Sequence, residues 1–190
     1  MNFYKFYFKE NTDGEYSYSS TQLQTTEDIA NQVIEFGKQI PEDMIYTDPE
    51  DPAYGREDDI HVTVLYGLHN ETSVDCENII KETKPFTIKL GNISFFESDD
   101  YRVMKIEIES EELHELYQKL KDNTENTQSF DEYNPHCTIA YVKKDYDDSN
   151  LDIEKFKDIE LPVNNIVFSS KNKEDIGRIN IPLEGDDEKI

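Results

Sequence analysis

The sequence predicts an α+β fold in which antiparallel strands pair as hairpins and helices pack against them. Short stretches that alternate apolar and polar residues, as strands do, are interspersed with stretches of helical periodicity. Turn-forming residues separate some neighbouring strands by only a few positions, as at residues 98–100, and such short connections favour hairpins. The two halves of the chain are also alike, because each contains strands, a helix and then a strand that begins with His-x-Thr.

In the first half, alternation and turn signals predict strands, and a capped apolar periodicity predicts a helix. Thr25 or Thr26 begins this helix, and Pro41 ends it because proline disfavours helical backbone in the residue before it. The predicted elements are strands over residues 3–9 and 16–23 with a turn at 11–14, a helix from Thr25 or Thr26 to Ile40, a proline-rich acidic loop over 41–59 and a strand over 60–67.

In the second half, Ser110 is placed to cap a helix whose apolar positions are Leu113, Leu116 and Leu120. The other elements follow from the same strand, helix and turn signals. The predicted order is a helix over 73–81, strands over 85–96 and 101–109, the helix from Ser110, a polar loop over 122–131, a strand over 135–142, a short helix over 153–156, and strands over 159–169 and 175–183.

At 190 residues, the chain is expected to form a single bilobal domain over residues 1–184, followed by an acidic tail over 185–190. The first ten residues mix aromatic and polar side chains without a long apolar run, so neither a signal peptide nor a membrane anchor is predicted. Cys76 and Cys137 are too few for a disulfide framework. We therefore expect a cytoplasmic protein without a membrane partner.

The net charge of −24 is the most unusual bulk property of the chain. An aromatic share of 12% is too large for a disordered polyanion, so a folded core inside an acidic, solvated surface is expected. Such a surface repels a phosphate backbone, which argues against long nucleic acid as a partner. A small nucleotide remains possible, because it needs only one locally neutral or positive cleft.

Two segments share the pattern His, apolar, Thr, apolar, apolar, Tyr: residues 61–66 and residues 136–141. Side chains alternate across a strand, so the His and Thr of each segment share one face and the apolar residue between them points to the other. A polar face on a core strand needs partners, which predicts that it lines a cleft. Two imidazoles in one cleft fit a reaction that needs one base and one acid near neutral pH.

Other chemistries fit the sequence less well. Neither half offers a cluster of Cys and His at zinc-binding spacing, and there is no glycine-rich phosphate loop or G-x-S-x-G segment. The remaining histidines, His69 and His114, lack the repeated pattern and are expected to have ordinary surface or packing roles.

The paired motifs resemble those of the 2H phosphoesterase superfamily, which includes RNA 2′,5′-ligase-like proteins and cyclic phosphodiesterases. The resemblance implies a LigT-like bilobal fold, in which two antiparallel sheets face a central cleft and helices lie outside. Longer stretches are similar to phage anti-CBASS phosphodiesterases, which degrade the cyclic nucleotide messengers of bacterial immunity. These stretches are Tyr18–Leu23, the helix ending at Ile40-Pro41, Asp59–Leu68, Asn134–Val142 and Val167–Lys171.

The resemblance implies a metal-independent phosphodiesterase that acts on cyclic di- or oligonucleotides such as 3′,3′-cGAMP, without a cofactor, in the cytoplasm of an infected bacterium. His61 and His136 would be the base and the acid, in an order that the sequence leaves open. Thr63 and Thr138 would donate hydrogen bonds to the non-bridging phosphate oxygens.

Five residues are weaker candidates for substrate binding. Three lie at the end of a predicted strand and two are tyrosines: Ser169, Ser170, Lys171, Tyr18 and Tyr54. The serines and the lysine can reach a second phosphate or can simply be a polar strand end. The tyrosines can stack on a base. Two alternative functions stay open: a 2H enzyme for 2′,3′-cyclic phosphate RNA ends or small cyclic nucleotides, and a cyclic-nucleotide sponge without turnover.

Overall fold

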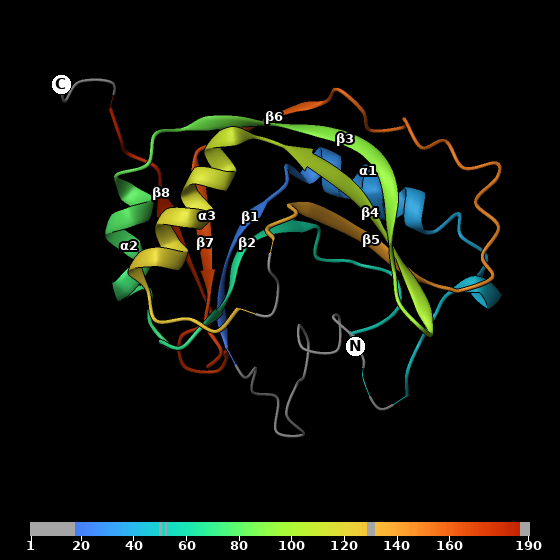
Figure 1. The fold of residues 1–190 in the computed structure, drawn as a ribbon, viewed down its shortest axis with the longest axis horizontal. Helices are drawn as coiled ribbons and strands as arrows, with labels where there is room; N and C mark the ends of the chain where they lie inside the picture. The colour runs from blue at the N-terminus through green and yellow to red at the C-terminus, as the bar shows by residue number, and fades with distance from the viewer. Residues whose placement is uncertain (1–17, 50, 52, 129–131, 187–190) are drawn as a thin grey trace.

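The computed structural model describes residues 18–49, 51, 53–128 and 132–186. Their strands form one antiparallel sheet with the order β6-β3-β4-β5-β2-β1-β7-β8 (Figure 1). The α+β fold predicted from the sequence is therefore confirmed. The strands are β1 (Ser19–Gln24), β2 (His61–Leu68), β3 (Phe86–Glu97), β4 (Tyr101–Glu109), β5 (His136–Lys143), β6 (Glu160–Val163), β7 (Asn165–Ser169) and β8 (Arg178–Pro182).

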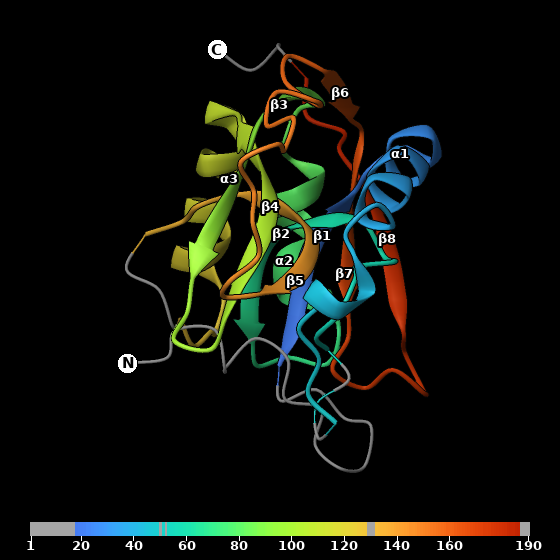
Figure 2. The same cartoon turned by 90° about the vertical axis from the view of Figure 1, so that its right-hand side faces the viewer.

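The two expected sheets are two halves of this one sheet. One half is β6-β3-β4-β5 and the other is β2-β1-β7-β8. They meet where β5 and β2 run antiparallel, with Val62 and Cys137 as paired residues. The sheet is strongly curled in both views (Figures 1 and 2). Since β2 and β5 are the two strands that begin with His-x-Thr, the junction brings both motifs to the middle of the molecule.

Three α-helices of the described chain pack against the sheet: α1 (Glu27–Gly37), α2 (Val74–Lys81) and α3 (Glu111–Asn123). Helix α1 contacts β5, α3 contacts β2, and α2 contacts α3 and β8. In Figure 2, α1 and α3 lie at opposite sides of the view, with the central strands drawn between them. Of the two residues predicted to cap the first helix, Thr26 is the cap, and Ser110 caps α3. The hydroxyls of Thr26 and Ser110 accept hydrogen bonds from the backbone N–H groups of Ile29 and Leu113.

The core lies between the helices and the apolar face of the sheet, and it includes the residues that alternate with the motif side chains. Val62 and Cys137 are 0% and 1% exposed, so the faces of β2 and β5 opposite to the histidines are sealed. Both cysteines are buried and free, as expected from their number. No helix in the described part of the chain is long and apolar enough to cross a membrane.

Two predictions for the second half were wrong. Residues 153–158 form successive turns instead of a short helix over 153–156. The single strand over 159–169 is split at Asn164 into β6, which pairs with β3 at one edge of the sheet, and β7, which pairs with β1 and β8 near the other edge. Two consecutive polar residues, Asn164 and Asn165, interrupt the alternation at the split, but the apolar residues on both sides of them still suggested one strand.

The other predicted elements agree with the structure to within a few residues. The loop before β2 additionally contains a short 3-10 helix, η1 (Glu42–Met44). Helix α1 ends at Gly37, three residues before the predicted end at Ile40. The predicted strand over 3–9 and the turn at 11–14 lie outside the described residues.

Candidate active site

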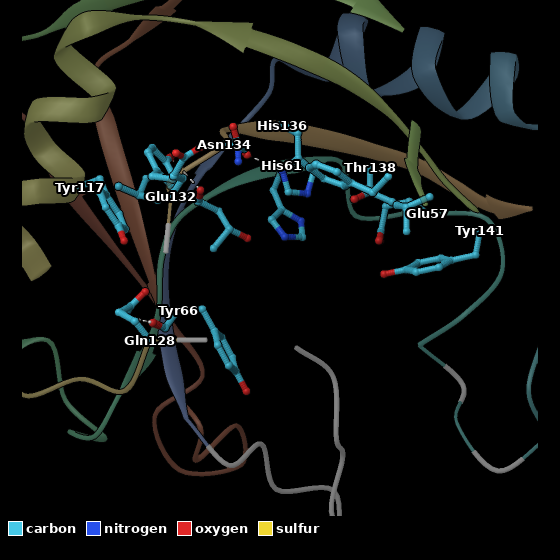
Figure 3. A pocket seen from close by; sticks show the side chains of 15 residues that line it. Glu57, His61, Tyr66, Tyr117, Gln128, Glu132, Asn134, His136, Thr138 and Tyr141 are labelled. Atoms are coloured by element: carbon cyan, nitrogen blue, oxygen red, sulfur yellow. Dashed lines mark hydrogen bonds between the residues drawn. The ribbon is translucent and has the colours of Figure 1, made fainter. Parts of the chain in front are cut away.

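The two His-x-Thr motifs lie side by side in one cleft, because β2 and β5 are neighbours. His61, Thr63, His136 and Thr138 all line this cleft, together with Glu57 from the preceding loop. Figure 3 shows His61 and His136 close together at its centre, with Tyr66 to one side and Tyr141 to the other. The structure thus brings together the four residues that the sequence singled out.

The two motifs also have equivalent neighbours across the sheet. Thr63 pairs with Gln22 of β1, and Thr138 pairs with Lys105 of β4. The same register continues along each motif, with the pairs His61–Gln24, His136–Glu107, Tyr66–Ser20 and Tyr141–Val103. The site therefore repeats about an approximate twofold axis, although the side chains that flank the two motifs differ in charge.

A β-bulge in each motif brings its tyrosine into the cleft. Strict alternation would point Tyr66 and Tyr141 away from the histidines, because each lies an odd number of positions after its histidine. In β2 the register skips one residue, Val64, and in β5 it skips Ile139. The extra residue resets the alternation. Both tyrosines consequently line the same cleft as the histidines.

Both imidazoles are held in the same way by a backbone carbonyl two residues earlier. His61 Nδ1 lies 2.6 Å from the Asp59 carbonyl oxygen, and His136 Nδ1 lies 2.7 Å from that of Asn134. A carbonyl oxygen only accepts, so each Nδ1 carries the hydrogen and donates it. Each Nε2 is thereby left to exchange a proton with a bound molecule.

The surroundings of His136 favour its neutral form. Burial is the main cause that lowers its pKa, to about 4, and the nearby Lys105 ammonium acts in the same direction. Lys105 is itself buried, 6% exposed, and its Nζ donates to Ser94 Oγ at 2.6 Å. The Phe96 ring lies between them, 4.8 Å from the His136 ring and 4.3 Å from Lys105 Nζ.

The surroundings of His61 are acidic instead. Its Nδ1 lies 3.8 Å from a carboxylate oxygen of Asp59, and both Asp59 oxygens accept hydrogen bonds from Arg178 of β8. Glu57 lines the cleft beside His61; burial raises the pKa of its carboxyl group, and the attraction of His61 opposes this. The two histidines therefore differ in the charge of their neighbours.

Arg56 holds the loop that carries Glu57. Its guanidinium donates to the backbone oxygens of Gly37 and Ile40 at 3.0 and 2.7 Å, and to Glu42. These contacts fix the loop to the end of α1. The Glu57 N–H in turn donates to the Ile139 carbonyl at 2.9 Å, next to the bulge of β5.

The hydroxyl groups of Thr63 and Thr138 have no hydrogen-bond partner among the described residues. Both side chains are partly exposed in the cleft. Two hydroxyl donors are therefore free to bind an anionic oxygen placed between the motifs.

The cleft has two adjoining parts. The first, which we call the histidine pocket, contains both motifs. The second, which we call the serine pocket, shares Glu57, His61, Thr63 and Tyr66 with the first. The serine pocket is otherwise lined by Tyr18, Ser20, Gln22, Ala53, Tyr54, Arg56, Asp58, Asp59, Ser169, Ser170, Lys173 and Arg178.

Four of the five weaker candidates line the serine pocket, and Lys171 lines neither pocket. Ser170 is 1% exposed and its hydroxyl donates to the Glu71 carbonyl at 2.7 Å, so it fixes a loop. Tyr18 stacks on His69 with a ring distance of 5.5 Å. Tyr54 packs edge-on against Tyr141 at 5.1 Å.

His69 and His114 lie outside both pockets, as expected. His69 Nε2 contacts the Thr127 hydroxyl at 2.8 Å, and His114 packs against the Tyr133 ring. In the described part of the chain, no group of three His, Cys, Asp or Glu side chains has the arrangement of a metal site.

Sequence reasoning missed several residues of the cleft. Tyr66 and Tyr141 could have been found from their repeated place in the motif, but alternation argued against them. Nothing in the sequence marks Gln22, Glu57 or Lys105, since the strands and loop that carry them meet the motifs only in the folded chain.

Comparison with known families identifies one match. A sequence model described as the 2′-5′ RNA ligase superfamily matches residues 31–175, which include both motifs. No curated protein matches the chain by sequence.

Solved structures with the same fold include TT0787 of Thermus thermophilus, which is 14% identical, with a TM-score of 0.64 over 89% of this chain and 99% of that one. E. coli LigT, in apo form, is 14% identical with a TM-score of 0.56, over 89% of this chain and 95% of LigT. LigT in complex with 3′-AMP gives a TM-score of 0.55 at the same identity and coverage. At such identities the likeness shows the fold.

Proposed function

Because the chain belongs to the 2′-5′ RNA ligase superfamily and is thus a phosphodiesterase of the 2H type, we propose that it cleaves 3′-5′ bonds of cyclic di- or oligonucleotides without a metal. The observation that carries the proposal is the cleft itself. It presents two imidazoles with available Nε2 atoms and two free threonine hydroxyls. Each half of the sheet supplies one imidazole and one hydroxyl.

The ribose 2′-hydroxyl beside the phosphodiester is the nucleophile, held at high effective concentration. A neutral histidine takes the proton of this hydroxyl, and O2′ forms a bond to phosphorus. The bond from phosphorus to O5′ breaks, and the second histidine gives its proton to O5′. The product is a 2′,3′-cyclic phosphate, which water opens while the two histidines exchange roles.

The environments of the histidines divide these roles. His136 is the base in the first step, since burial and the Lys105 ammonium lower its pKa and keep Nε2 unprotonated. His61, which lies beside the Asp59 carboxylate, is then the acid. After the first step His136 holds the proton that it returns to the leaving oxygen when water attacks.

Thr63 and Thr138 stabilise the charge that develops on the non-bridging oxygens. Their hydroxyls face the cleft from paired strands, so one phosphate between them can accept from both. Donors of this kind are effective because they are oriented before the reaction begins.

Three observations favour a cyclic di- or oligonucleotide over an RNA end. The cleft continues from the histidine pocket into the serine pocket, so a phosphodiester at His61 would lie where the two pockets adjoin. The net charge of −24 disfavours long RNA. The stretches around both motifs are similar to phage enzymes that remove cyclic nucleotide messengers. The proposed role is therefore evasion of CBASS defence by a phage, inside the bacterial cytoplasm.

The test is to incubate the protein in EDTA with 3′,3′-cGAMP, other cyclic di- and trinucleotides and a 2′,3′-cyclic mononucleotide, and to separate the products by chromatography. Cleavage of cyclic dinucleotides that persists in EDTA and is lost in His61→Ala and His136→Ala supports the proposal. Turnover of the mononucleotide alone points to the RNA-end enzyme instead. Binding and release of intact ligand, without turnover, identifies a sponge.

A further inference from the structure

Gln22 of β1 is a buried polar residue with an unused donor. It is 4% exposed and lines the serine pocket. Among the described residues, nothing accepts a hydrogen bond from its Nε2 atom. A buried amide N–H without a partner destabilises the folded protein, and most buried polar groups are paired. The free donor therefore needs an explanation.

The position of Gln22 in the sheet connects it with the active site. It pairs with Thr63 in β2 on one side and with Val167 in β7 on the other. Its counterpart in the second half of the sheet is Lys105, which pairs with Thr138. Lys105 already uses a donor on Ser94 and lies 3.7 Å from Glu107, whereas Gln22 keeps its donor open.

The side chains around Gln22 suit a ligand rich in acceptor oxygens. Ser20 and Ser169, which pair with each other across β1 and β7, also line the serine pocket. Lys173 and Arg178 also line this pocket, together with the acidic side chains Glu57, Asp58 and Asp59, of which Asp59 is paired with Arg178. Hydroxyl, amide and cationic groups together match the phosphate, ribose and base oxygens of a nucleotide.

We propose that Gln22 is a specificity-determining residue: it donates a hydrogen bond from Nε2 to an oxygen of the nucleotide that occupies the serine pocket. This inference rests on the proposed function and extends it. A dinucleotide with its scissile phosphate at the histidines fills both pockets, whereas a nucleoside 2′,3′-cyclic phosphate fills only the histidine pocket. Gln22 thereby selects substrates that join two nucleotides.

The test is Gln22→Met, which keeps the length of the side chain and removes the amide. We expect kcat/KM for 3′,3′-cGAMP to fall roughly 10-fold, as for loss of one hydrogen bond. Turnover of the 2′,3′-cyclic mononucleotide keeps its wild-type rate, and the melting temperature stays level or rises because an unpaired buried donor is gone.

Gln24→Met is the matched control. Gln24 lies two residues along the same strand face and also has an unpartnered buried Nε2, but it lines neither pocket. Its replacement leaves kcat/KM for 3′,3′-cGAMP unchanged. An equal loss in both variants overturns the proposal, because it would reflect a general disturbance of β1. An equal loss on both substrates, or a lower melting temperature with full activity, also overturns it.

A binding measurement separates this inference from the proposed function. Calorimetry with intact 3′,3′-cGAMP is done in the His136→Ala background, with and without Gln22→Met, so that no turnover is needed. A dissociation constant that rises roughly 10-fold on losing the amide supports the contact even if the wild type cleaves nothing. An unchanged constant, or no binding in either protein, overturns the contact.

Discussion

His61 and His136 are the same residue in equivalent positions, yet their surroundings make them chemically different. Each donates from Nδ1 to a carbonyl two residues earlier, so their orientation and tautomer are alike. The difference lies in the charges around the rings, with the Lys105 ammonium near His136 and the Asp59 carboxylate near His61. Neighbouring charge, and not ring geometry, is thus the basis on which the base and the acid are proposed.

Each histidine is expected to contribute roughly 10²–10⁴-fold to kcat/KM, so His61→Ala and His136→Ala should each lose that much on a cyclic dinucleotide. A uridine 3′-(4-nitrophenyl phosphate) separates the roles, because nitrophenolate leaves without a proton. On this ester, His61→Ala should recover most of its activity, and His136→Ala should remain impaired. Recovery in His136→Ala alone would reverse the assignment.

The pH dependence of kcat/KM tests the effect of Lys105. The pKa of His136 is about 4, below its usual 6.5, so the proposed base stays unprotonated well into the acidic range. The fall of kcat/KM on the acidic side of the pH profile should therefore lie below pH 6.5. Lys105→Met removes a cation that lowers this pKa. The pKa of His136 should therefore rise, and the acidic limb of the kcat/KM profile should move to higher pH. The activity of the variant relative to the wild type should fall most at acidic pH.

Lys89→Met is the control for this measurement, because Lys89 lies on the neighbouring strand β3 and pairs with Asp158 outside both pockets. It should keep the wild-type profile. An acidic limb that stays in place in Lys105→Met would show that Lys105 does not act on the base.

At the scale of the elements, one bulge in β2 and one in β5 build the two walls of the cleft. A regular strand would present His, Thr and then Leu65 or Ala140 on the cleft face. The extra residue turns the tyrosine inward and the small or branched residue toward the core, where Leu65 and Ala140 are 1% and 0% exposed. The two motifs that share a sequence pattern therefore also share a β-bulge at the same place.

The end of β2 offers a stability test. Gly67 has φ +92°, and an added Cβ would lie 2.0 Å from the Thr127 carbonyl oxygen. Gly67→Ala should therefore lower the free energy of unfolding by more than the roughly 1–3 kcal/mol of backbone strain alone. Urea denaturation measures the loss.

Gly55→Ala is the matched variant, because Gly55 also has positive φ, +122°, but an added Cβ would meet no atom within 4 Å. It should show the backbone strain without the clash. Equal losses in the two variants would mean that the chain near Thr127 moves aside without cost.

At the scale of the whole molecule, the net charge of −24 sets the response to salt. Like charges repel one another in the compact state, and salt shortens the range of this repulsion to about 10 Å at 0.1 M. Raising NaCl from about 0.05 M to about 0.5 M should therefore raise the melting temperature. A neutral osmolyte at equal osmolality is the control, and a melting temperature that is indifferent to NaCl would contradict the expectation.

The sequence by itself determined most element types and the four central residues of the cleft. Alternation, capping and turn signals depend on residues a few positions apart, so β4, the caps Thr26 and Ser110, and the shared face of each His-x-Thr pair could be predicted. The repeat of the motif also indicated that both pairs serve one cleft.

Only the tertiary structure decided which side chains surround the motifs. The bulges depend on the register between strands, and the break at Asn164 depends on two partners at opposite ends of the sheet. Gln22 and Lys105 face the motifs because β1 and β4 are the neighbours of β2 and β5. Pairing between distant strands is a property of the folded chain, because its free energy comes from contacts that no short segment contains.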